Sequence, residues 1–249
     1  MIGTYSKTET DFDVVIVGAG FAGMYMLHSL RCLGFSVCVI ESGDGVGGTW
    51  YWNQYPGARC DTESMYYSYQ FSEELQQEWD WSELYPGQSE ILSYANHVAN
   101  KFNLYRNIRF KKHVTACYWD DNKRFWTVET DPGQSLRATF CVMATGCLSS
   151  PNFPAIPGLS TFEGDVLHTA EWPSQNTNFV GKSVAVIGTG SSAIQIIPEI
   201  AKIAKHLFVF QRTANYIVPA NNRPLKTTEI EHIKANYPAL RNKAKSTYS

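Results

Sequence analysis

Two glycine-rich turns constrain the fold of this chain more than any other feature of its sequence. The first reads Gly18-Ala-Gly-Phe-Ala-Gly23 and follows the apolar run 12–17, and the second reads Gly188-Thr-Gly-Ser-Ser-Ala193 and follows the run 183–187. A segment with apolar residues at helical spacing comes after each turn. A buried strand, a glycine turn and a helix in this order are typical of a dinucleotide site. We therefore expect an α/β fold with two such units, each with a mostly parallel sheet.

The residues after the first turn complete the pattern of a nucleotide site. A helix is predicted over 21–33, with Gly34 just beyond its end, and a second strand over 36–40 leads directly into Glu41. Glu41 lies about 20 residues beyond the turn, where an acid hydrogen-bonds the ribose hydroxyls. The residues that serve the tight turn, the approach of the pyrophosphate and the packing of helix on strand are Gly18, Gly20 and Gly23.

The middle of the chain is expected to add a helix and an antiparallel insert. Apolar residues at helical spacing predict a helix over 89–104, whose polar face is solvated. Alternating patterns over 114–119, 125–130 and 136–143 predict three strands separated by polar turns. Three prolines within 151–157 then mark an extended crossover to the second unit.

The second unit differs from the first at the end of its second strand. A helix is predicted over 193–205, with a kink at Pro198, and a strand over 207–210 ends at Arg212 and its neighbours rather than at an acid. An acid there would repel a 2′-phosphate, whereas a guanidinium matches phosphate geometry. We therefore expect NADPH as the second cofactor; the simpler alternative is a solvated surface arginine. The residues expected to line its pyrophosphate at the helix N-terminus are Thr189, Gly190, Ser191, Ser192, Ala193, Ile194 and Gln195. The last stretch of the chain is polar, and its final residues are charged and helix-prone.

Composition and charge exclude several classes of protein. The chain has 249 residues with 21 basic and 23 acidic side chains, so it lacks the basic surface of a nucleic-acid-binding protein. The N-terminus has no basic-then-apolar signal pattern, and no apolar run approaches the roughly 18 residues of a membrane span. The 6 cysteines form no Cys-x-x-Cys pair and no metal spacing. We therefore expect a cytoplasmic protein without membrane contact or metal, and we disfavour a disulfide reductase.

The segment 162–173 joins the two units and reads Phe-Glu-Gly-Asp-Val-Leu-His-Thr-Ala-Glu-Trp-Pro. Gly164 allows close backbone approach, His168 offers two ring nitrogens, and Trp172 supplies a bulky anchor before a proline. By themselves these residues also fit an ordinary linker with a buried histidine. Their spacing matches Phe-x-Gly-x-x-x-His-x-x-x-Trp-Pro, the fingerprint of Baeyer–Villiger monooxygenases, so the chain resembles that family of FAD- and NADPH-dependent flavoproteins. Many members carry an acid where this chain has Ser174.

The resemblance implies two Rossmann-like domains, both incomplete in this chain. We expect a disordered N-terminus over 1–11 and an FAD-binding domain over 12–150. A linker over 151–180 follows, and the NADPH-binding domain begins at 181 and continues to 249.

The stretch 45–61 is a glycine-rich loop rimmed by aromatic residues, with Arg59 and Asp61 expected to be exposed for pairing; a surface Ω-loop is the alternative. The resemblance implies that this stretch meets the flavin. Residues matched to FAD contacts are Phe21, Gly48, Thr49, Trp50, Trp52, Asp61, Tyr67 and, near the adenine, Val114. Residues matched to the nicotinamide cofactor are Arg59, Cys60, Asp61, Arg212 and Thr213, and Thr62 is a further expected cofactor-binding residue. Asp61 and His168 are the expected catalytic residues. For Asp61 the reason is that an acid beside a flavin can orient a cationic partner; Tyr66 and Tyr67 are expected only as wall residues.

The resemblance also implies a reaction. NADPH reduces FAD, and one oxygen atom from O₂ is inserted next to a ketone carbonyl to give an ester or lactone. Related flavin monooxygenases that oxidise soft N or S centres lack the Trp-Pro ending. Family members are longer, and their remainder supplies an arginine at the flavin and much of the substrate pocket. Three alternatives stay open: a ketone-oxygenating enzyme, alone or with a complementary chain; an uncoupled NADPH oxidase that releases hydrogen peroxide; and a non-catalytic nucleotide-binding fragment.

Overall fold

The computed structural model describes residues 10–173 and 177–247, which form two compact units. The first unit comprises residues 1–52 and 95–152, and the second comprises residues 53–94 and 153–249; the boundary falls inside helix α4 (Gln88–Lys101). Residues 53–94, which we expected within the FAD-binding domain, are thus grouped with the second half of the sequence. The cofactor assigned to each domain stays a prediction. Residues 1–9 of the expected tail and Ser174 lie outside the described residues.

The described part of the first unit contains a six-stranded sheet in the order β3-β2-β1-β6-β5-β4. Strands β1, β2, β3 and β6 run parallel, whereas β5 pairs antiparallel with β6 and β4. The strands are β1 (Phe12–Val17), β2 (Val37–Ile40), β3 (Ile108–Arg109), β4 (His113–Asp120), β5 (Phe125–Asp131) and β6 (Gln134–Met143). The predicted strands are confirmed, with β3 added at the edge.

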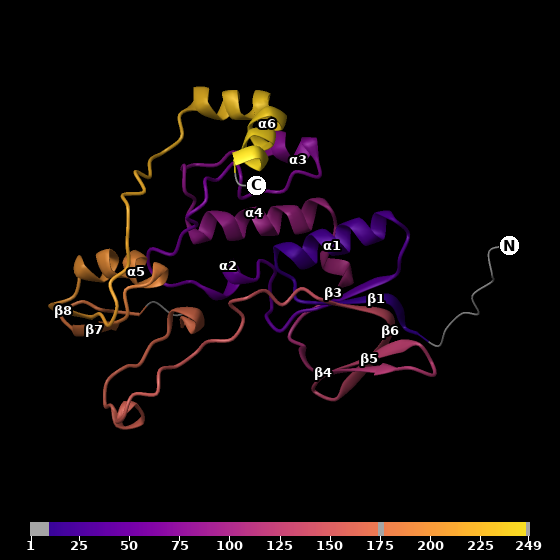
Figure 1. Ribbon diagram of the computed structural model, residues 1–249, viewed down its shortest axis with the longest axis horizontal. Coiled ribbons are helices and arrows are strands. Elements are labelled where there is room, and N and C mark those ends of the chain that lie inside the picture. The colour runs from indigo at the N-terminus through magenta and orange to yellow at the C-terminus, as the bar shows by residue number, and fades with distance from the viewer. Residues whose placement is uncertain (1–9, 174–176, 248–249) are drawn as a thin grey trace. The chain divides into compact units, whose positions relative to one another are not determined.

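Helices cover one face of this sheet, and the antiparallel strands fold over the other (Figure 1). Helix α1 (Phe21–Cys32) contributes Met24 and Leu27 to a core that includes Ala99 from the part of α4 in this unit. On the opposite face Val15 packs in a second core with Val128 of β5. Because both faces are covered, β2 and the part of β1 from Val14 to Val17 are continuous apolar runs and do not alternate.

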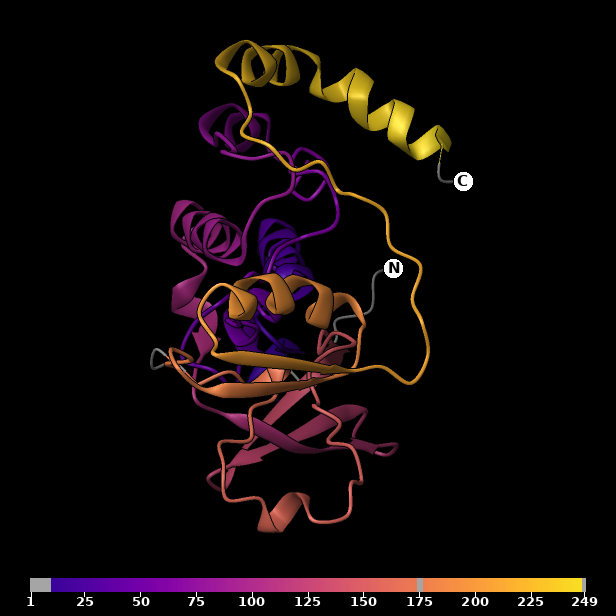
Figure 2. The same ribbon diagram turned by 90° about the vertical axis from the view of Figure 1, so that its left-hand side faces the viewer.

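The second unit contains two parallel strands, β7 (Ser183–Ile187) and β8 (His206–Phe210). Helix α5 (Ser191–Ala201) covers one face of this pair (Figure 2). Its buried Ile196 and Ile200 pack in a core with Phe179, and Val186 and Leu207 from the strands pack against it. The opposite face carries exposed apolar side chains. The helix begins two residues earlier and ends four residues earlier than the predicted range 193–205, and Pro198 lies inside it.

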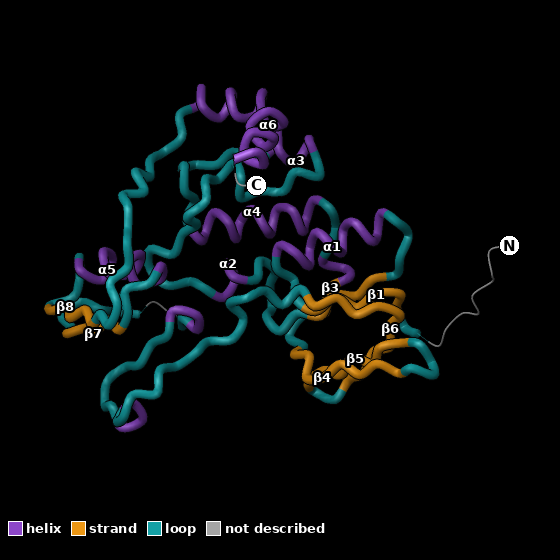
Figure 3. The backbone as a smooth tube through the Cα atoms, in the orientation of Figure 1, coloured by secondary structure: helices purple, strands orange, loops and turns teal. Residues whose placement is uncertain are grey.

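Several short elements connect these layers. They are α2 (Thr49–Trp52), α3 (Glu73–Glu78), and the 3-10 turns η1 (Tyr105–Asn107), η2 (Leu159–Thr161) and η3 (Thr169–Glu171). Residues 144–158 and 211–223 run without helix or strand assignments, as Figure 3 shows. The helix-prone end of the chain forms α6 (Thr227–Thr247), which contains Pro238 and changes direction along its length in Figure 2. No helix in the described ranges is long and apolar enough to cross a membrane.

Candidate cofactor sites

The first glycine turn brings β1 and α1 into direct backbone contact. Gly18 has φ +104°, and a side chain there would place its Cβ 2.6 Å from the carbonyl oxygen of Ala144. A Cβ on Gly23 would lie 1.9 Å from the carbonyl oxygen of Gly18. Only glycine allows both the left-handed turn and the close approach of helix to strand. The turn therefore has the backbone that we predicted for it.

A second glycine segment meets the N-terminus of α1. Gly48 has φ +56°, and its Cβ would lie 2.9 Å from Cα of Gly20. Gly20 caps α1 without a side-chain hydrogen bond, and the first turn of α1 contains no acidic residue. The first turn of α1 therefore adds no negative charge of its own at the positive end of the helix, where an anion can bind. The predicted residues Gly18, Gly20, Phe21, Gly23, Gly48 and Thr49 are brought together here.

Glu41 is tied to the same turn. Its side chain is buried, with 5% of the residue exposed. One carboxylate oxygen accepts a hydrogen bond from the backbone N–H of Ala19 at 2.7 Å, and the other accepts one from Gly43 at 2.8 Å. These bonds hold the carboxylate against the glycine turn, as a ribose ligand requires. Ribose binding itself remains a prediction.

The aromatic residues after Gly48 have unequal exposure. Trp50 is buried, whereas Trp52 is 42% exposed. The Tyr51 ring packs against Gly43 and its hydroxyl donates to Asp44 at 2.5 Å. The other predicted flavin contact of this unit, Val114 on β4, is half-buried and packs against the core of Val15 and Val128.

The second glycine turn is open. Gly188 has φ +105°, and a Cβ at Gly188 or Gly190 would meet nothing within 4 Å. Gly190 caps α5 without a side-chain bond, and the first turn of α5 contains no acid. The turn lies beside the end of β8, because the Gly188 N–H donates to the carbonyl of Phe210 at 2.9 Å. Thr189 is already engaged: its hydroxyl accepts from Gln211 at 3.1 Å and its carbonyl accepts from Asn215.

Gln195 holds a loop rather than facing solvent. Its side-chain oxygen accepts from the hydroxyl of Tyr55 at 2.8 Å and from the backbone N–H of Arg59 at 3.3 Å. Its side-chain nitrogen donates to the carbonyl of Arg59 at 3.0 Å. Gly57 allows this packing, because a Cβ there would lie 2.5 Å from the carbonyl oxygen of Gln195. We had predicted a backbone role for Gln195 at the pyrophosphate; its side chain has this additional structural role.

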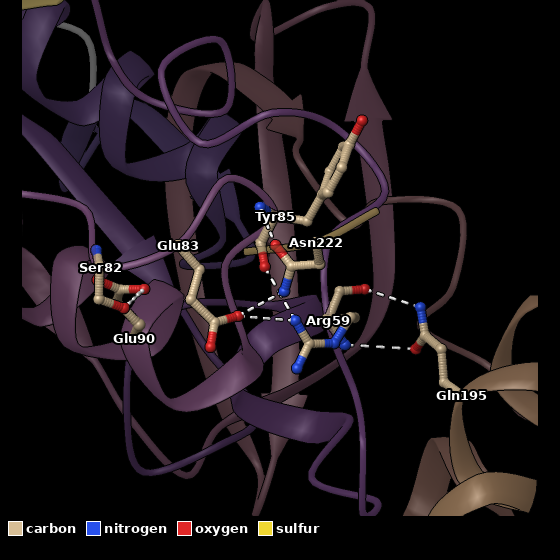
Figure 4. A network of polar contacts seen from close by, with 7 residues as sticks. All are labelled: Arg59, Ser82, Glu83, Tyr85, Glu90, Gln195 and Asn222. Atoms are coloured by element: carbon tan, nitrogen blue, oxygen red, sulfur yellow. Dashed lines mark hydrogen bonds and ion pairs between the residues drawn. The ribbon is translucent and has the colours of Figure 1, made fainter. Parts of the chain in front are cut away.

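We expected Arg59 to be exposed for pairing; it is paired, but it is half-buried rather than exposed. Its guanidinium donates to Glu83 at 2.9 Å and to the carbonyl of Tyr85 at 3.0 Å (Figure 4). Asn222 donates to the same Glu83 oxygen at 2.6 Å and accepts from the N–H of Tyr85 at 2.9 Å. The hydrogen bond from Arg59 is the main reason that the pKa of Glu83 lies below its ordinary value. The guanidinium is therefore occupied within the second unit.

The neighbours of Arg59 have different environments. Cys60 is buried, and burial raises the pKa of its thiol. Asp61 and Thr62 are exposed, so the predicted catalytic carboxylate is accessible to a ligand. Tyr67, like Tyr66, is half-buried.

Several residues of the fingerprint segment 162–173 make local contacts that hold the segment in shape. The Phe162 ring lies over Gly164, where a Cβ would approach it to 2.6 Å. His168 accepts a hydrogen bond at Nδ1 from the N–H of Ala170 at 3.1 Å, which fixes the ring at the start of η3. The Trp172 ring lies tilted beside that of Phe179, with centroids 6.1 Å apart, and packs against the α5 core. The predicted phosphate contacts, Arg212 and Thr213, are exposed.

Sequence reasoning missed the residues that hold these loops in place. Glu83 and Asn222 lie 24 and 163 residues from Arg59, and Asn215 lies 26 residues from Thr189. None of them stands in a motif or in a periodic segment. Because each acts through hydrogen bonds to residues distant in the sequence, no local signal could have indicated it.

Comparison with protein families agrees with this architecture. Residues 15–245 match the family model described as pyridine nucleotide-disulphide oxidoreductase. The six cysteines of this chain are nevertheless free. Among the described residues, no group of three or more His, Cys, Asp or Glu side chains could hold a metal ion.

The curated relatives and solved structures that the chain resembles include several monooxygenases. The chain is 43% identical over 238 residues to a Baeyer–Villiger monooxygenase of Pseudooceanicola batsensis, which covers 95% of this chain and 44% of the relative. It is 43% identical to the phenazine N-monooxygenase PhzNO1 of Lysobacter antibioticus, over 93% of this chain and 43% of the relative. An oxidized steroid monooxygenase bound to NADP is 55% identical with a TM-score of 0.88, over 92% of this chain and 44% of that one.

The chain thus spans less than half the length of these relatives and aligns with their N-terminal halves. The two glycine turns and the mainly parallel first sheet are the features that the match with the family predicts. The chain belongs to the pyridine nucleotide-disulphide oxidoreductase family and, within it, is homologous to the N-terminal part of Baeyer–Villiger monooxygenases.

Proposed function

We propose that this chain binds FAD and NADPH and serves a monooxygenase that inserts one oxygen atom from O₂ next to a ketone carbonyl, forming an ester or lactone. The observation that carries the proposal is the pair of glycine turns, each at the N-terminus of a helix whose first turn has no acidic residue. Both helix ends suit a pyrophosphate. The names of the relatives, which include ketone monooxygenases, support the reaction class.

The residues of the first unit fit a flavin nucleotide. Gly20 and Gly48 leave backbone accessible at the end of α1, and Glu41 offers its carboxylate beside the turn. Phe21 and Thr49 lie at the starts of α1 and α2, next to these glycines. When bound and reduced by NADPH, FAD would supply the activation of O₂. In this proposal Glu41 binds the ribose hydroxyls and Val114 contacts the adenine.

The residues of the second unit fit a phosphorylated nicotinamide nucleotide. The turn from Gly188 to Ala193 is open, β8 ends beside it at Phe210, and Arg212 follows two residues later. We assign Arg212 and Thr213 to the 2′-phosphate, because a guanidinium forms bidentate bonds to phosphate. Asp61 is assigned to orient a cationic partner at the flavin. His168 is assigned to hydrogen-bond a bound cofactor through Nε2, because its Nδ1 already accepts from Ala170.

The deciding experiment is flavin loading of the purified chain. The chain is incubated with FAD, desalted, and its visible spectrum is followed during anaerobic addition of NADPH. Retained flavin that bleaches supports the proposal. Aerobic turnover is then assayed with cyclic ketones for ester, with an aromatic N-heterocycle for N-oxide, and for hydrogen peroxide.

The alternatives have separate outcomes in this assay. Peroxide without ester identifies an uncoupled NADPH oxidase, and N-oxide without ester identifies an N-oxygenating enzyme. Flavin that is retained only when the C-terminal half of a relative is co-expressed identifies a need for a complementary chain. Failure to retain flavin in either case contradicts the proposal. We also propose a reducing, cytoplasmic location, which the six free cysteines support.

A further inference from the structure

Two cysteines that are distant in the sequence meet inside the first unit. Cys117 lies on β4 and Cys141 on β6, and their sulfur atoms are 3.9 Å apart. These two strands are not neighbours, because β5 lies between them in the sheet. The contact exists because the antiparallel strands fold back over the parallel ones, and both side chains pack against the core that contains Val15 and Val128. Neither cysteine belongs to the cofactor sites proposed above.

A β-bulge directs Cys117 toward this core. The pairing of β4 with β5 shifts register between Val114 and Ala116. Residues three apart on a regular strand face opposite sides, but one extra residue restores the same side. Val114 and Cys117 consequently both pack against this core. Cys117 therefore lies on the same strand as Val114, the residue assigned to the adenine, and faces the same core.

The two thiols are not equivalent. The Cys141 thiol donates a hydrogen bond to the Cys117 sulfur. Burial, together with the neighbouring Cys117, raises the pKa of Cys141 to about 12. Cys141 is therefore the donor and Cys117 the acceptor of this contact, and the thiolate form of a cysteine is its nucleophilic form. Cys117 lies on the edge strand of the sheet and is half-buried, so a small oxidant can reach it.

We propose that Cys117 and Cys141 are a redox-active dithiol that hydrogen peroxide converts to a disulfide. The Cys117 thiolate attacks one peroxide oxygen, the O–O bond breaks, and Cys117 becomes a sulfenic acid while hydroxide leaves. The Cys141 sulfur then attacks the Cys117 sulfur, the S–O bond breaks, and the thiol proton leaves with the hydroxyl group as water. In sum two thiols lose two electrons and two protons, and one peroxide becomes two water molecules. The sulfur atoms must close from 3.9 Å to about 2 Å, which an edge strand can accommodate.

The disulfide would join β4 to β6 directly. Because β4 also carries Val114, the bond would shift the strand at the proposed adenine contact. This consequence depends on the proposed function, whereas formation of the disulfide does not. Oxidation is expected to lower FAD retention, and reduction with dithiothreitol is expected to restore it.

The test is peptide mapping of the full chain after hydrogen peroxide treatment and alkylation under denaturing, non-reducing conditions. We expect one cross-linked peptide pair that contains Cys117 and Cys141 and that disappears after reduction. The variant in which the exposed Cys32 and Cys147 are both replaced by serine serves as the control and should form the same cross-link. In Cys141→Ser, dimedone should trap a sulfenic acid on Cys117.

Contrary results are equally defined. The proposed dithiol is contradicted if peroxide oxidises Cys32 and Cys147 while Cys117 and Cys141 both stay reduced and are therefore alkylated. The same holds if Cys117 proceeds to sulfinic acid without a cross-link in the unmodified chain. If the cross-link forms but FAD retention does not change, the link to the adenine contact is overturned while the dithiol stands. The cross-link is measured in the unmodified chain, so the test does not depend on whether a variant folds.

Discussion

Arg212 is the residue on which the choice of nicotinamide cofactor depends. It is exposed at the end of β8, beside the open glycine turn. We predict that Arg212→Ala weakens NADPH binding by about 2 kcal/mol, or roughly thirtyfold, because charge-assisted bonds to the 2′-phosphate are lost. NADH binding should hardly change. Titration of both cofactors, with Lys205→Ala as the control for lost surface charge, checks this; equal losses for NADPH and NADH would contradict the assignment.

Glu83 is the second residue with a testable role, because it neutralises Arg59. Its pKa is depressed mainly by the hydrogen bond from Arg59, so the folded state favours the ionised carboxylate. Such a group contributes stability above its unfolded pKa, near 4.5, and this stability disappears as the pH falls through the lower folded value. Both side chains are about one-third exposed, so solvent screening limits the contribution to about 1 kcal/mol or less.

We therefore predict that Glu83→Gln lowers stability at pH 7 and flattens the acid side of the stability profile. Urea unfolding midpoints between about pH 3 and pH 7 measure both effects. Glu231→Gln, an exposed position on α6, is the control for the change in charge. Parallel profiles for the unmodified chain and Glu83→Gln would show that the ion pair contributes nothing.

Among the elements, the contact between α5 and the loop before Arg59 depends on one glycine. Gly57 has φ +82° and lies against the carbonyl of Gln195. We predict that Gly57→Ala destabilises the second unit by about 1–3 kcal/mol, because a side chain there is strained and meets backbone. Gly87→Ala is the matched control, since that position has no positive φ and open space around it. Urea unfolding should separate the two variants; similar midpoints would disprove the packing argument.

The elements themselves were largely predictable, because most are defined by local spacing. Apolar runs and glycine turns located β1, β7 and the start of α1. The bounds of α5 were shifted, because its first turn begins at Ser191, inside the glycine motif. The short helix α3 was missed: its N-cap, Ser72, is followed by charged and polar residues with a single buried side chain, Leu75. Such a helix has too little periodicity to be recognised.

At the level of the whole molecule, the exposed apolar face of β7 and β8 is the feature that we expect to affect self-association most. Phe208 is 55% exposed, and Phe210 and Ile187 are also exposed. Leu207 points the other way, into the α5 core. Apolar surface of this kind promotes association. We predict that Phe208→Ser reduces self-association in size-exclusion chromatography with light scattering and leaves the unfolding midpoint nearly unchanged.

Leu207→Ser is the matched variant on the same strand. It should cost about 2 kcal/mol or more, because it places a hydroxyl in the apolar core and leaves a cavity. The two variants together test which face of the strand is buried. Equal destabilisation by both, or no change in association for Phe208→Ser, would contradict the arrangement.

Spacing along the chain was sufficient to predict the α/β class, the two glycine turns, the strands around them and the position of Arg212. These features are local, since a turn or a strand depends on residues that follow one another. Tertiary contacts alone decided that Arg59 pairs with Glu83, that Gln195 holds the loop at Gly57, and that Cys117 meets Cys141. Each of these contacts joins segments distant in sequence, and its energy exists only after the layers have packed. The spacing of residues along the chain does not predict such contacts, so they are seen only in the folded structure.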